Sequence, residues 1–520
     1  MRNLIVVFGD QLNRDSSAFD GFDRTCDAVL MAEIDHEATH VWCHKRRIAL
    51  FFSAMRHFRD ELLADGVDVH YHALTQRDSP AGGKDFASTI ETAVHGLQPS
   101  ALIATMPGDY RVLSAIQDAA GRTKTVLDVH PDEHIFCGID EFQAYAGDKK
   151  RLVMEDFYRA MRKRHDVLLN DSGEPEGGAW NFDKENRKAF GRAGPGIVAP
   201  PLSFPPDETT EEVIELVEQR YPDHPGSLEN FDLPINRRQA KAMLGHFIES
   251  SLPCFGAFQD AMWTGEPFLY HSRLSTSLNM HLLSARECVG AAIDAYRRGA
   301  APINSVEGYV RQVLGWREFM HGIYWRHMPQ YIDLNHFECE IDVPSFYWDG
   351  KTEMRCMHET MQQILRHGYA HHIQRLMVAG LFAMLLGVEP RKFHDWHLAM
   401  YLDAIDWVSL PNALGMSQHG DGGIVGTKPY CASGNYINKM SNYCGRCRYD
   451  FRKAVGVDAC PYTTLYWDFL DRHQAEFRRN PRMYMQIKNL ERRLNDPSDM
   501  AEIRKRAREL RDTVRAGKTF

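Results

Sequence analysis

The stretch HETMQQILRHGYAHHIQRLMVAGLFAMLLG, residues 358–387, decides how the second half of the chain folds. Its apolar residues recur at the spacing of an amphipathic helix, over a length too great for a single strand. EGYVRQVLGWREFMHGIYW at 307–325 and EIRKRARELRDTVRAG at 502–517 have the same spacing. We therefore predict that nearly everything beyond about residue 235 is helical.

The N-terminal part of the chain alternates short apolar runs with helical patterns. The strand-like runs are NLIVVF (3–8), AVLMAEI (28–34), VDVHYHAL (67–74), ALIATM (101–106) and TVLDVH (125–130). Residues 45–64 between them have the apolar spacing of a helix. Such alternation is typical of a parallel sheet covered by helices.

These patterns divide the chain into three parts. We expect an α/β parallel-sheet domain over 1–135 and an all-α domain over 231–520. Residues 136–230 begin with charged helix and continue with Gly- and Pro-rich stretches such as GRAGPGIVAPPLSFPPDE at 191–208. This composition predicts an interdomain connector that is available for binding.

Bulk properties limit the function classes. A chain of 520 residues exceeds what one hydrophobic core supports, and 44% hydrophobic residues with 25% charged residues are typical of globular proteins. No apolar run approaches the roughly 20 residues that span a bilayer, which predicts a cytoplasmic protein without a membrane segment. The net charge of −9 argues against nucleic-acid binding unless a local basic face outweighs it.

Cysteine spacing gives the strongest local chemical signal. Cys444 and Cys447 flank a tight Gly-Arg turn, and Cys460 follows with a proline directly after it. Two thiolates on one turn can ligate one metal centre, and Cys356 is the candidate fourth ligand. Four thiolates suit zinc, and the Cys-Pro step is typical of ferredoxin-type clusters. Structural zinc, an iron–sulfur cluster and ordinary thiols therefore all remain open from spacing alone.

Polar residues interrupt the helical half at several points. SRLSTS at 272–277 offers hydroxyls and N–H groups that can bind a pyrophosphate, although Ser and Thr before a helix also act as N-caps. Arg375 and Asp403 are charged residues of this half, and from the sequence either could be a surface charge.

Four segments in this order resemble the flavin-binding core of the photolyase/cryptochrome family. They are HSRLSTSLN (271–279), RQVLGWREF (311–319), HHIQRLMVAGLF (371–382) and YLDAIDWVSLPNALGM (401–416). GGAWNFDKENR at 177–187, KPYCASGNYINKMSNYC at 428–444 and the four cysteines narrow the resemblance to the bacterial iron–sulfur photolyases, which repair (6-4) photoproducts in DNA. The resemblance covers essentially the whole chain.

The resemblance implies an FAD site in the helical domain. Ser272, Leu274, Ser275, Thr276 and Ser277 resemble the loop that holds the diphosphate. Arg375 and Asp403 resemble the pair beside the isoalloxazine, where a guanidinium stabilises the anionic reduced ring. Trp316 and Arg317 match the helix beneath the adenine and lesion pocket. The position that faces flavin N5 falls on Ser409, where an amide or acidic side chain is more usual.

The resemblance also implies catalytic residues. His372 lies three residues before Arg375, where the (6-4) enzymes place a histidine that gives and retrieves a proton. Gln312 resembles the amide that binds the damaged base, although one inserted residue, Gly315, blurs the match. The second histidine of the animal enzymes falls on Leu376, so His371 or water would replace it.

Further cofactors and electron carriers follow from the same resemblance. The four cysteines would hold a [4Fe–4S] cluster. Trp396 and Trp348 match the residues that pass electrons to the flavin, while the familiar triad position falls on Ala413 and the neighbour of Trp396 is His397. The N-terminal domain would bind 6,7-dimethyl-8-ribityllumazine as an antenna. Its candidate residues lie at strand ends, where α/β sheets bind ligands: Gly9, Asp10, Glu37 and Asp109.

Basic and aromatic residues are candidates for binding UV-damaged DNA. Arg187, Lys428 and Tyr430 are the candidate contacts, because basic groups neutralise phosphates and aromatic rings support an unstacked base. Further basic residues occur at 149–151, 159–164 and 446–448, and a solvated helix face explains those at 149–164 almost as well.

Three functions are compatible with these features. The first is a monomeric (6-4) photolyase, an enzyme of the carbon–carbon lyase class, with His372 as proton donor. The second is a blue-light photoreceptor of the cryptochrome type without repair activity. The third is an iron–sulfur protein of DNA metabolism without light chemistry, which would need no flavin core. His372, Gln312 and the 177–187 segment favour repair.

Overall fold

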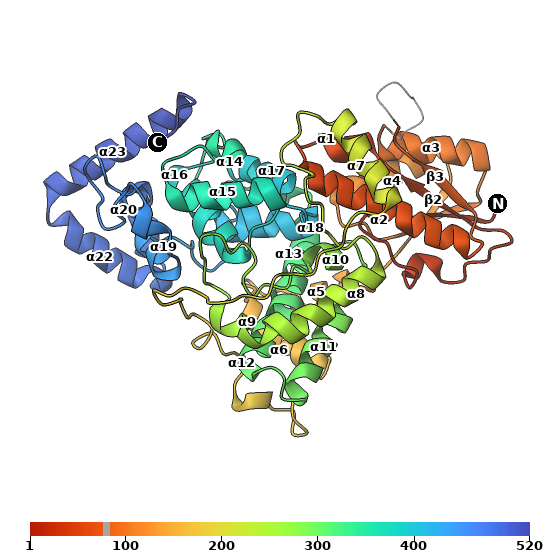
Figure 1. Cartoon of the computed structure of the whole chain (residues 1–520), viewed down its shortest axis with the longest axis horizontal. Helices are drawn as coiled ribbons and strands as arrows, with labels where there is room; N and C mark the ends of the chain where they lie inside the picture. The colour runs from red at the N-terminus through yellow and green to blue at the C-terminus, as the bar shows by residue number, and fades with distance from the viewer. Residues whose placement is uncertain (76–83) are drawn as a thin grey trace.

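The computed structural model describes residues 1–75 and 84–520, with an α/β N-terminal part and a helical remainder (Figure 1). Five parallel strands form one sheet in the order β3-β2-β1-β4-β5. The strands are β1 (Asn3–Val6), β2 (Ala28–Ala32), β3 (Val69–His72), β4 (Ala101–Thr105) and β5 (Val126–His130). The predicted parallel sheet is thereby confirmed, with shorter strands than the apolar runs.

The two faces of the sheet bury alternate residues of β1, as the two-residue period of a strand requires. Leu4 and Val6 pack in a small core with α3 (Phe86–Leu97) and α4 (Tyr110–Thr123). Ile5 belongs instead to the large core, which includes α2 (Lys45–Ala64) and extends through the helical part. One continuous core therefore joins the sheet to the helices.

The segment between sheet and helical bulk contributes to both. α5 (Ile139–Ala146) and α6 (Met154–Arg164) pack on α13 (Glu318–His327) and the helical turn before it. α7 (Glu208–Arg220) returns to pack along α2, as Figure 1 shows.

The rest of the chain is helical, which confirms the prediction for this half. Its helices, besides α13, are α8 (Arg237–His246), α9 (Leu252–Phe258), α10 (Ser275–Asn279), α11 (Ala285–Arg297), α12 (Ile303–Val310), α14 (Phe346–Asp349), α15 (Arg355–His367), α16 (Leu381–Leu386), α17 (Pro390–Met400), α18 (Asp406–Leu410), α19 (Gly434–Met440), α20 (Pro461–Arg472), α21 (Gln474–Phe477), α22 (Tyr484–Leu494) and α23 (Pro497–Arg515). α1 (Asp35–Thr39) is a short helix after β2.

The long helical pattern at 358–387 is broken in the structure. α15 ends at Gly368, whose φ of 59° is left-handed and whose Cβ position lies 2.5 Å from Leu402, so only glycine fits there. The chain then re-enters a helix through a π-helical turn at Gln374–Gly380. Similar π turns occupy Arg311–Arg317 and Pro411–Ser417. Gly315 lies in the first of these, and such a wide turn can accommodate one additional residue.

None of the helices within the described ranges has the length and apolar character needed to cross a membrane.

Candidate functional site

A cavity of about 300 Å³ lies among the helices of the second half. Ten of the predicted site residues line it: Ser272, Ser275, Gln312, Trp316, Arg317, His371, His372, Arg375, Asp403 and Ser409. Leu274, Thr276 and Ser277 are buried beside it but do not line it. No side chain caps α10, whose N-cap position is Leu274, so the interpretation of this loop as a Ser/Thr N-cap is wrong.

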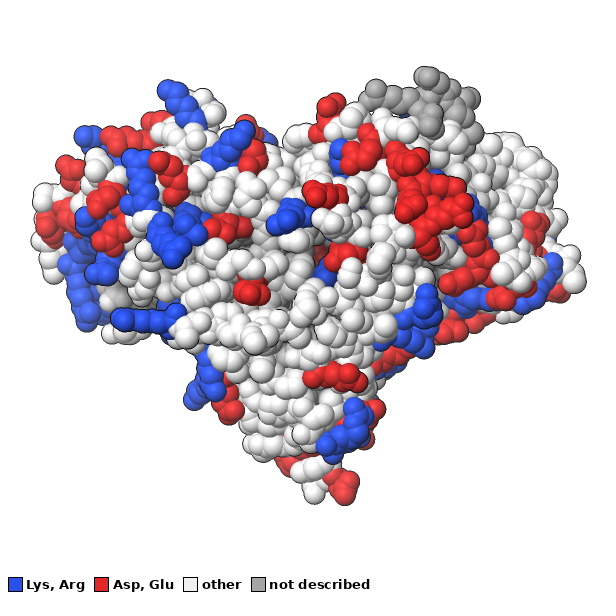
Figure 2. Space-filling view, in the orientation of Figure 1, with Lys and Arg blue, Asp and Glu red and all other residues white. Residues whose placement is uncertain are grey.

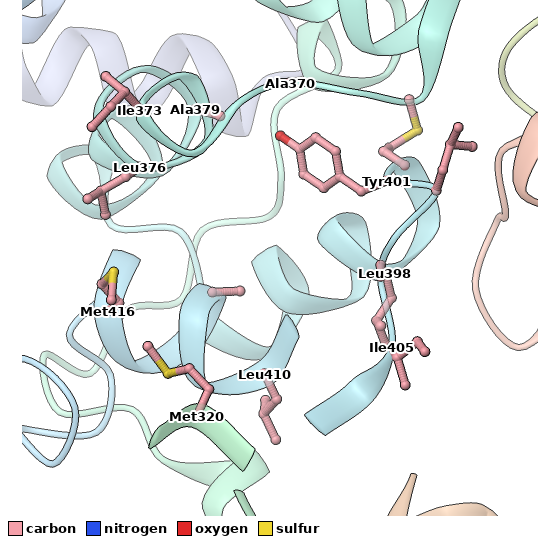
Figure 3. Packing of buried hydrophobic residues seen from close by; sticks show 14 of the residues in the cluster. Met320, Ala370, Ile373, Leu376, Ala379, Leu398, Tyr401, Ile405, Leu410 and Met416 are labelled. Carbon is pink, nitrogen blue, oxygen red and sulfur yellow. The ribbon is translucent and has the colours of Figure 1, made fainter. Parts of the chain in front are cut away.

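The three π turns position the walls of this cavity. Each contributes lining residues, among them Gln312, Leu376 and Met416. Figure 3 shows Leu376 and Met416 facing the same space as Met320 of α13. A π turn is wider than an α turn and is often found at functional sites. Residues far apart in sequence thus converge on one cavity.

Arg375 and Asp403 form a bidentate ion pair at this cavity. Arg375 Nη1 donates to Asp403 Oδ1 at 2.9 Å and Nη2 donates to Oδ2 at 3.1 Å, while Nε donates to the Ala370 carbonyl at 2.7 Å. The guanidinium also lies 3.9 Å from the centre of the Tyr401 ring. Burial alone would raise the pKa of Asp403, but the charge and hydrogen bonds of Arg375 hold it below its ordinary value. The pair therefore stays charged.

The two neighbouring histidines occupy different environments. His372 is exposed, and it lines the cavity. Although its side chain reaches solvent, the protein atoms packed around the ring remove part of its hydration, and together with the charge of Arg375 they lower its pKa to about 4. His371 is buried and stacks on His271, with ring centroids 4.4 Å apart and planes at 11°. Neither ring nitrogen of His371 has a hydrogen-bond partner among the described residues.

Several polar groups around the cavity lack protein partners. Among the described residues, Ser409 Oγ, His271 Nε2 and Arg317 Nε are buried without a hydrogen bond. Buried polar groups without partners are costly, which indicates that a polar ligand belongs here. Asn279, Phe393 and Asn412 also line the cavity, and sequence reasoning missed them. Asn412 could have been found as a polar side chain within the apolar run after Asp403.

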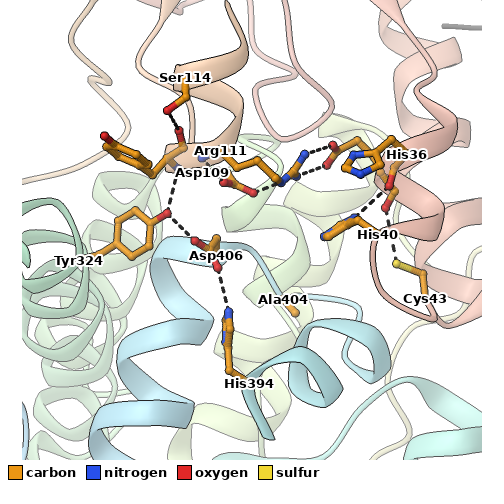
Figure 4. A network of polar contacts seen from close by, with 12 residues as sticks. His36, His40, Cys43, Asp109, Arg111, Ser114, Tyr324, His394, Ala404 and Asp406 are labelled. Atoms are coloured by element: carbon orange, nitrogen blue, oxygen red, sulfur yellow. Dashed lines mark hydrogen bonds and ion pairs between the residues drawn. The ribbon is translucent and has the colours of Figure 1, made fainter. Parts of the chain in front are cut away.

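A second cavity, of about 110 Å³, lies at the carboxyl ends of the strands. All four predicted antenna residues line it: Gly9, Asp10, Glu37 and Asp109. Arg111 donates to Glu37 Oε1 at 2.7 Å. It also donates to Asp109 Oδ2 at 3.0 Å, and Figure 4 shows these two residues. Burial raises the pKa of Asp10 to about 6, whereas the charge of Arg111 outweighs burial at Glu37 and lowers its pKa.

The segment from Asp403 to Ser409 separates the two cavities. Asp403 and Ser409 line the first cavity, while Ile405 and Asp406 line the second. Asp406 accepts hydrogen bonds from Tyr324 and, at 2.9 Å, from His394 Nε2 (Figure 4). These bonds hold Asp406 in the wall that the two cavities share.

The four predicted cysteines converge on one small cavity. Cys356 lies at the start of α15, Cys444 and Cys447 lie on and after a tight turn, and Cys460 directly precedes α20. All four are free thiols. The Cβ position of Gly434 lies 2.9 Å from Cys460 Sγ, so a larger residue would crowd this sulfur.

The spacing of these sulfurs differs from that of a zinc site. Four thiolates around one zinc ion lie about 3.8 Å apart, as Zn–S bonds of about 2.3 Å require. Within the described ranges, the one group of three or more metal-ligating side chains with all ligand atoms within 4.8 Å is Asp132, His134 and His281. In any three of the four cysteines, at least one pair of sulfurs is therefore more than 4.8 Å apart, which is wider than the spacing of four thiolates around one zinc ion.

Trp396 lies beside the first cavity, and Trp348 lies farther from it. Trp396 is 1% exposed, and its ring stacks on Phe393, a cavity-lining residue, with centroids 5.5 Å apart. Its Nε1 donates to the carbonyl of Tyr347 at 3.2 Å, and Tyr347 directly precedes Trp348 on α14. His397 also lines the cavity, and burial keeps its pKa well below the ordinary value.

Arg187 and Tyr430 come together although they are far apart in sequence. The charge of Arg187 acts on Tyr430, whose pKa burial raises, and Lys428 lies on the same loop as Tyr430. None of the three lines the first cavity. On the face shown in Figure 2, Lys and Arg gather over the C-terminal helices, whereas Asp and Glu gather over the region of α7.

Part of the predicted basic surface at 159–164 is used inside the protein. Arg162 is fully buried and donates to the carbonyls of Val167, Leu168 and Trp180. Arg159 pairs with Glu155 at 2.8 Å. The inclusion of Arg162 in a DNA-binding patch is therefore wrong, because its guanidinium closes a loop instead of facing solvent.

Comparisons with known proteins agree with this arrangement. A family model described as deoxyribodipyrimidine photo-lyase-related protein matches residues 5–233. The chain is 45% identical over 485 residues to a (6-4) photolyase from Agrobacterium fabrum. The aligned region covers 93% of this chain and 94% of the relative.

Two solved structures share the fold. A bacterial class III photolyase from Agrobacterium tumefaciens has a TM-score of 0.57 at 15% identity, covering 85% of this chain and 86% of that one. A cryptochrome from Synechocystis sp. PCC6803 has a TM-score of 0.56 at 12% identity, covering 84% and 88%. At these identities the likeness concerns the fold alone.

Proposed function

Because the chain belongs to the photolyase/cryptochrome family, we propose that it is a (6-4) photolyase, which uses light to repair (6-4) pyrimidine photoproducts in DNA. The observation that carries the proposal is that His372, Gln312 and the Arg375–Asp403 pair line one cavity. The photoreceptor alternative is not favoured, since the relative with 45% identity is named for repair. An iron–sulfur protein without light chemistry would not need this cavity.

Membership of the family implies FAD, and the first cavity has the residues to hold it. The hydroxyls of Ser272 and Ser275 line the cavity where a diphosphate needs donors. Arg375 is a fixed cation beside which an anionic ring gains stability, and Ser409 Oγ is a free polar group. When bound, FAD supplies the light-driven electron and receives it back, so repair involves no net redox change.

His372 supplies the proton that the lesion needs once it carries an additional electron. With a pKa of about 4, the ring is neutral at pH 7 while the cavity holds no anion. An anion close to the ring favours its charged form and raises the pKa. We infer that damaged DNA loads His372 with the proton that it then donates. His371 also lines the cavity, but it is buried and stacks on His271, so we assign the proton transfer to His372.

Gln312 binds the damaged base, and the charged surface holds the strand. The Gln312 side chain donates weakly to the Gly308 carbonyl, at 3.4 Å, so its amide is available to a base edge. Arg187 and Lys428 neutralise phosphates, and Tyr430 stacks on an extruded base. These contacts are ionic, and the net charge of −9 on the whole chain opposes them. DNA binding should therefore weaken steeply as the salt concentration rises.

The four cysteines hold a [4Fe–4S] cluster. The convergence of four free thiols on one cavity, with spacing wider than zinc requires, supports this assignment. Cys356 at the start of α15 and Cys460 before α20 make the cluster a link between distant helices. Its binding energy would therefore stabilise the fold.

The second cavity holds the antenna, 6,7-dimethyl-8-ribityllumazine. Asp10, Glu37 and Asp109 offer acceptors to ribityl hydroxyls, and Phe8, Phe51 and Phe52 offer apolar walls to a flat ring. Its position against the shared wall of Asp403–Ser409 suits energy transfer to the first cavity. We propose that the protein acts as a monomer in the cytoplasm.

A binding experiment tests the substrate class. In the dark, duplex DNA with one (6-4) lesion should bind more tightly than the same duplex without damage, as fluorescence anisotropy can measure. The Arg187→Glu variant should weaken both affinities. Equal affinity for the two duplexes would contradict the proposal.

A further inference from the structure

We propose that Trp42 is the solvent-facing end of an electron route that runs inward through Trp348 and Trp396 to the first cavity. This inference rests on the proposed function, because it extends the route of the two inner tryptophans. It assigns an electron-donating role to the N-terminal domain.

Trp42 contacts Trp348 across the boundary between the two parts of the molecule. Trp42 lies in the turn between α1 and α2, and Trp348 lies on α14 of the helical part. Their ring centroids are 5.3 Å apart, with planes at 44°. This is the range in which aromatic pairs are in direct contact. An electron can therefore pass between the two indoles without crossing solvent.

The exposure of the three rings increases outward. Trp396 is 1% exposed, Trp348 is half-buried, and Trp42 is 46% exposed. All nine tryptophans lie within the described residues, and among them only Trp42 is exposed. A positive charge is far less costly near water than in a buried, low-dielectric site. A positive charge that forms on Trp396 is therefore stabilised as it moves to Trp348 and then to Trp42.

The inner end of the route reaches the cavity through packed aromatic rings. Trp396 stacks on Phe393, which lines the cavity, and lies 5.0 Å from the ring of Tyr347. The hydrogen bond from Trp396 Nε1 to the Tyr347 carbonyl ends one peptide bond away from Trp348. Ring contacts, one hydrogen bond and one peptide bond thus connect the cavity to Trp348, and a ring contact connects Trp348 to Trp42.

Trp42 gives up one electron and one proton, and a reductant in solution restores both. One electron leaves Trp42 and neutralises the oxidised Trp348. The Trp42 cation then loses its indole proton to water and becomes a neutral radical. A small thiol in solution gives this radical a hydrogen atom and restores Trp42. Two of the resulting thiyl radicals combine to a disulfide, so each thiol supplies one electron and one proton.

The test compares Trp42→Phe with Trp42→Tyr, Trp348→Phe and a control, Trp467→Phe, in the FAD-loaded protein. Trp467 packs on Arg493 in the C-terminal helices, away from the route. Phenylalanine keeps an aromatic ring against Trp348 but is hard to oxidise, whereas tyrosine remains oxidisable. Thermal unfolding midpoints should be the same for all four variants and the wild type.

Two readouts that do not depend on repair decide the outcome. By flash photolysis, Trp42→Phe should shorten the lifetime of the tryptophan radical at least about tenfold, as loss of about 1.4 kcal/mol of charge stabilisation implies. Trp42→Tyr should shorten the lifetime less than Trp42→Phe does. The control Trp467→Phe should have the wild-type lifetime. After long illumination in air without thiol, peptide mass spectrometry should find oxidised Trp42 in the wild type.

Contradicting results fall into two kinds. If Trp42→Phe behaves as wild type while Trp348→Phe shortens the radical lifetime, the inner route stands and the role of Trp42 is refuted. If neither variant changes the lifetime, the route through Trp348 fails as well, and the electron assignment within the proposed function fails with it.

Discussion

Arg375 and Asp403 are 28 residues apart in sequence and meet through two parallel hydrogen bonds of 2.9 and 3.1 Å at the edge of the first cavity. The pair joins the π turn that begins at Gln374 to the loop after α17. The same two side chains therefore hold these segments together and set the charge at this edge of the cavity.

Asp403→Ala should reduce FAD retention and destabilise the protein. The variant leaves the Arg375 guanidinium without its partner, and removing one member of a buried ion pair costs about 3–5 kcal/mol. FAD content per chain and chemical unfolding measure the two effects. Asp342→Asn, which removes a surface carboxylate paired with Lys392, is the control and should change neither. Unchanged FAD content in Asp403→Ala would show that the pair lies outside the flavin site.

The sequence predicted that the second half of the chain is helical, but not where its helices break. Apolar spacing indicated helix over 358–387, yet the break at Gly368 depends on Leu402, which lies 34 positions further along the printed sequence. Motif order predicted that His372, Arg375 and Asp403 belong to one site, and all three line the first cavity. It could not reveal the shared wall of Asp403–Ser409, because that wall exists only once the α/β part packs on the helices.

Sequence patterns also misjudged groups whose role depends on burial. Arg162 has the same local composition as a solvated basic face, but three carbonyls accept its guanidinium hydrogens inside the fold. The residues next to Trp42 in the sequence give no indication of its role. Its contact with Trp348 joins two parts of the chain that are far apart in sequence. Long-range packing, which a single sequence does not display, decides both cases.

Cys447→Ser should remove the visible colour of the cluster and destabilise the C-terminal helices. Wild-type protein should contain iron and inorganic sulfide in equal amounts, as a [4Fe–4S] unit requires. Cys431→Ser is a matched control, because Cys431 is partly buried nearby but does not line the cysteine cavity. Iron and sulfide analysis with thermal unfolding measures the result. Zinc without sulfide in the wild type would contradict the cluster assignment.

The free energy of unfolding should fall as pH decreases from about 6.5 to about 4. Burial lowers the pKa of His44 and His321 to about 4, so the unfolded chain takes up protons that the folded protein cannot accept in this window. Each such group can cost up to about 3 kcal/mol by pH 4. Asp10, with a pKa raised to about 6, acts in the opposite direction. The decrease measured by denaturant titration should be smaller in His44→Gln, and an equal decrease would refute this role of His44.

His372→Ala should lose most repair while keeping FAD, DNA binding and flavin photoreduction. A positioned proton donor contributes about 10²–10⁴-fold to a rate, and without fast protonation the electron returns before the lesion reacts. His371→Ala is the matched neighbour and should have a milder effect, since His371 is buried against His271. Repair yield per absorbed photon is the measurement. Full repair by His372→Ala would keep the photolyase and reject this proton donor.

The most direct measurement of the central claim is illumination of the purified, FAD-reduced protein with a duplex that carries one (6-4) photoproduct. Chromatography of the digested DNA then quantifies restored thymines, with a dark sample and a lesion-free duplex as controls. We predict restoration that requires light and continues beyond one lesion per protein. A protein that binds FAD and is photoreduced, yet leaves the lesion intact after prolonged illumination, would contradict the account and establish the photoreceptor alternative.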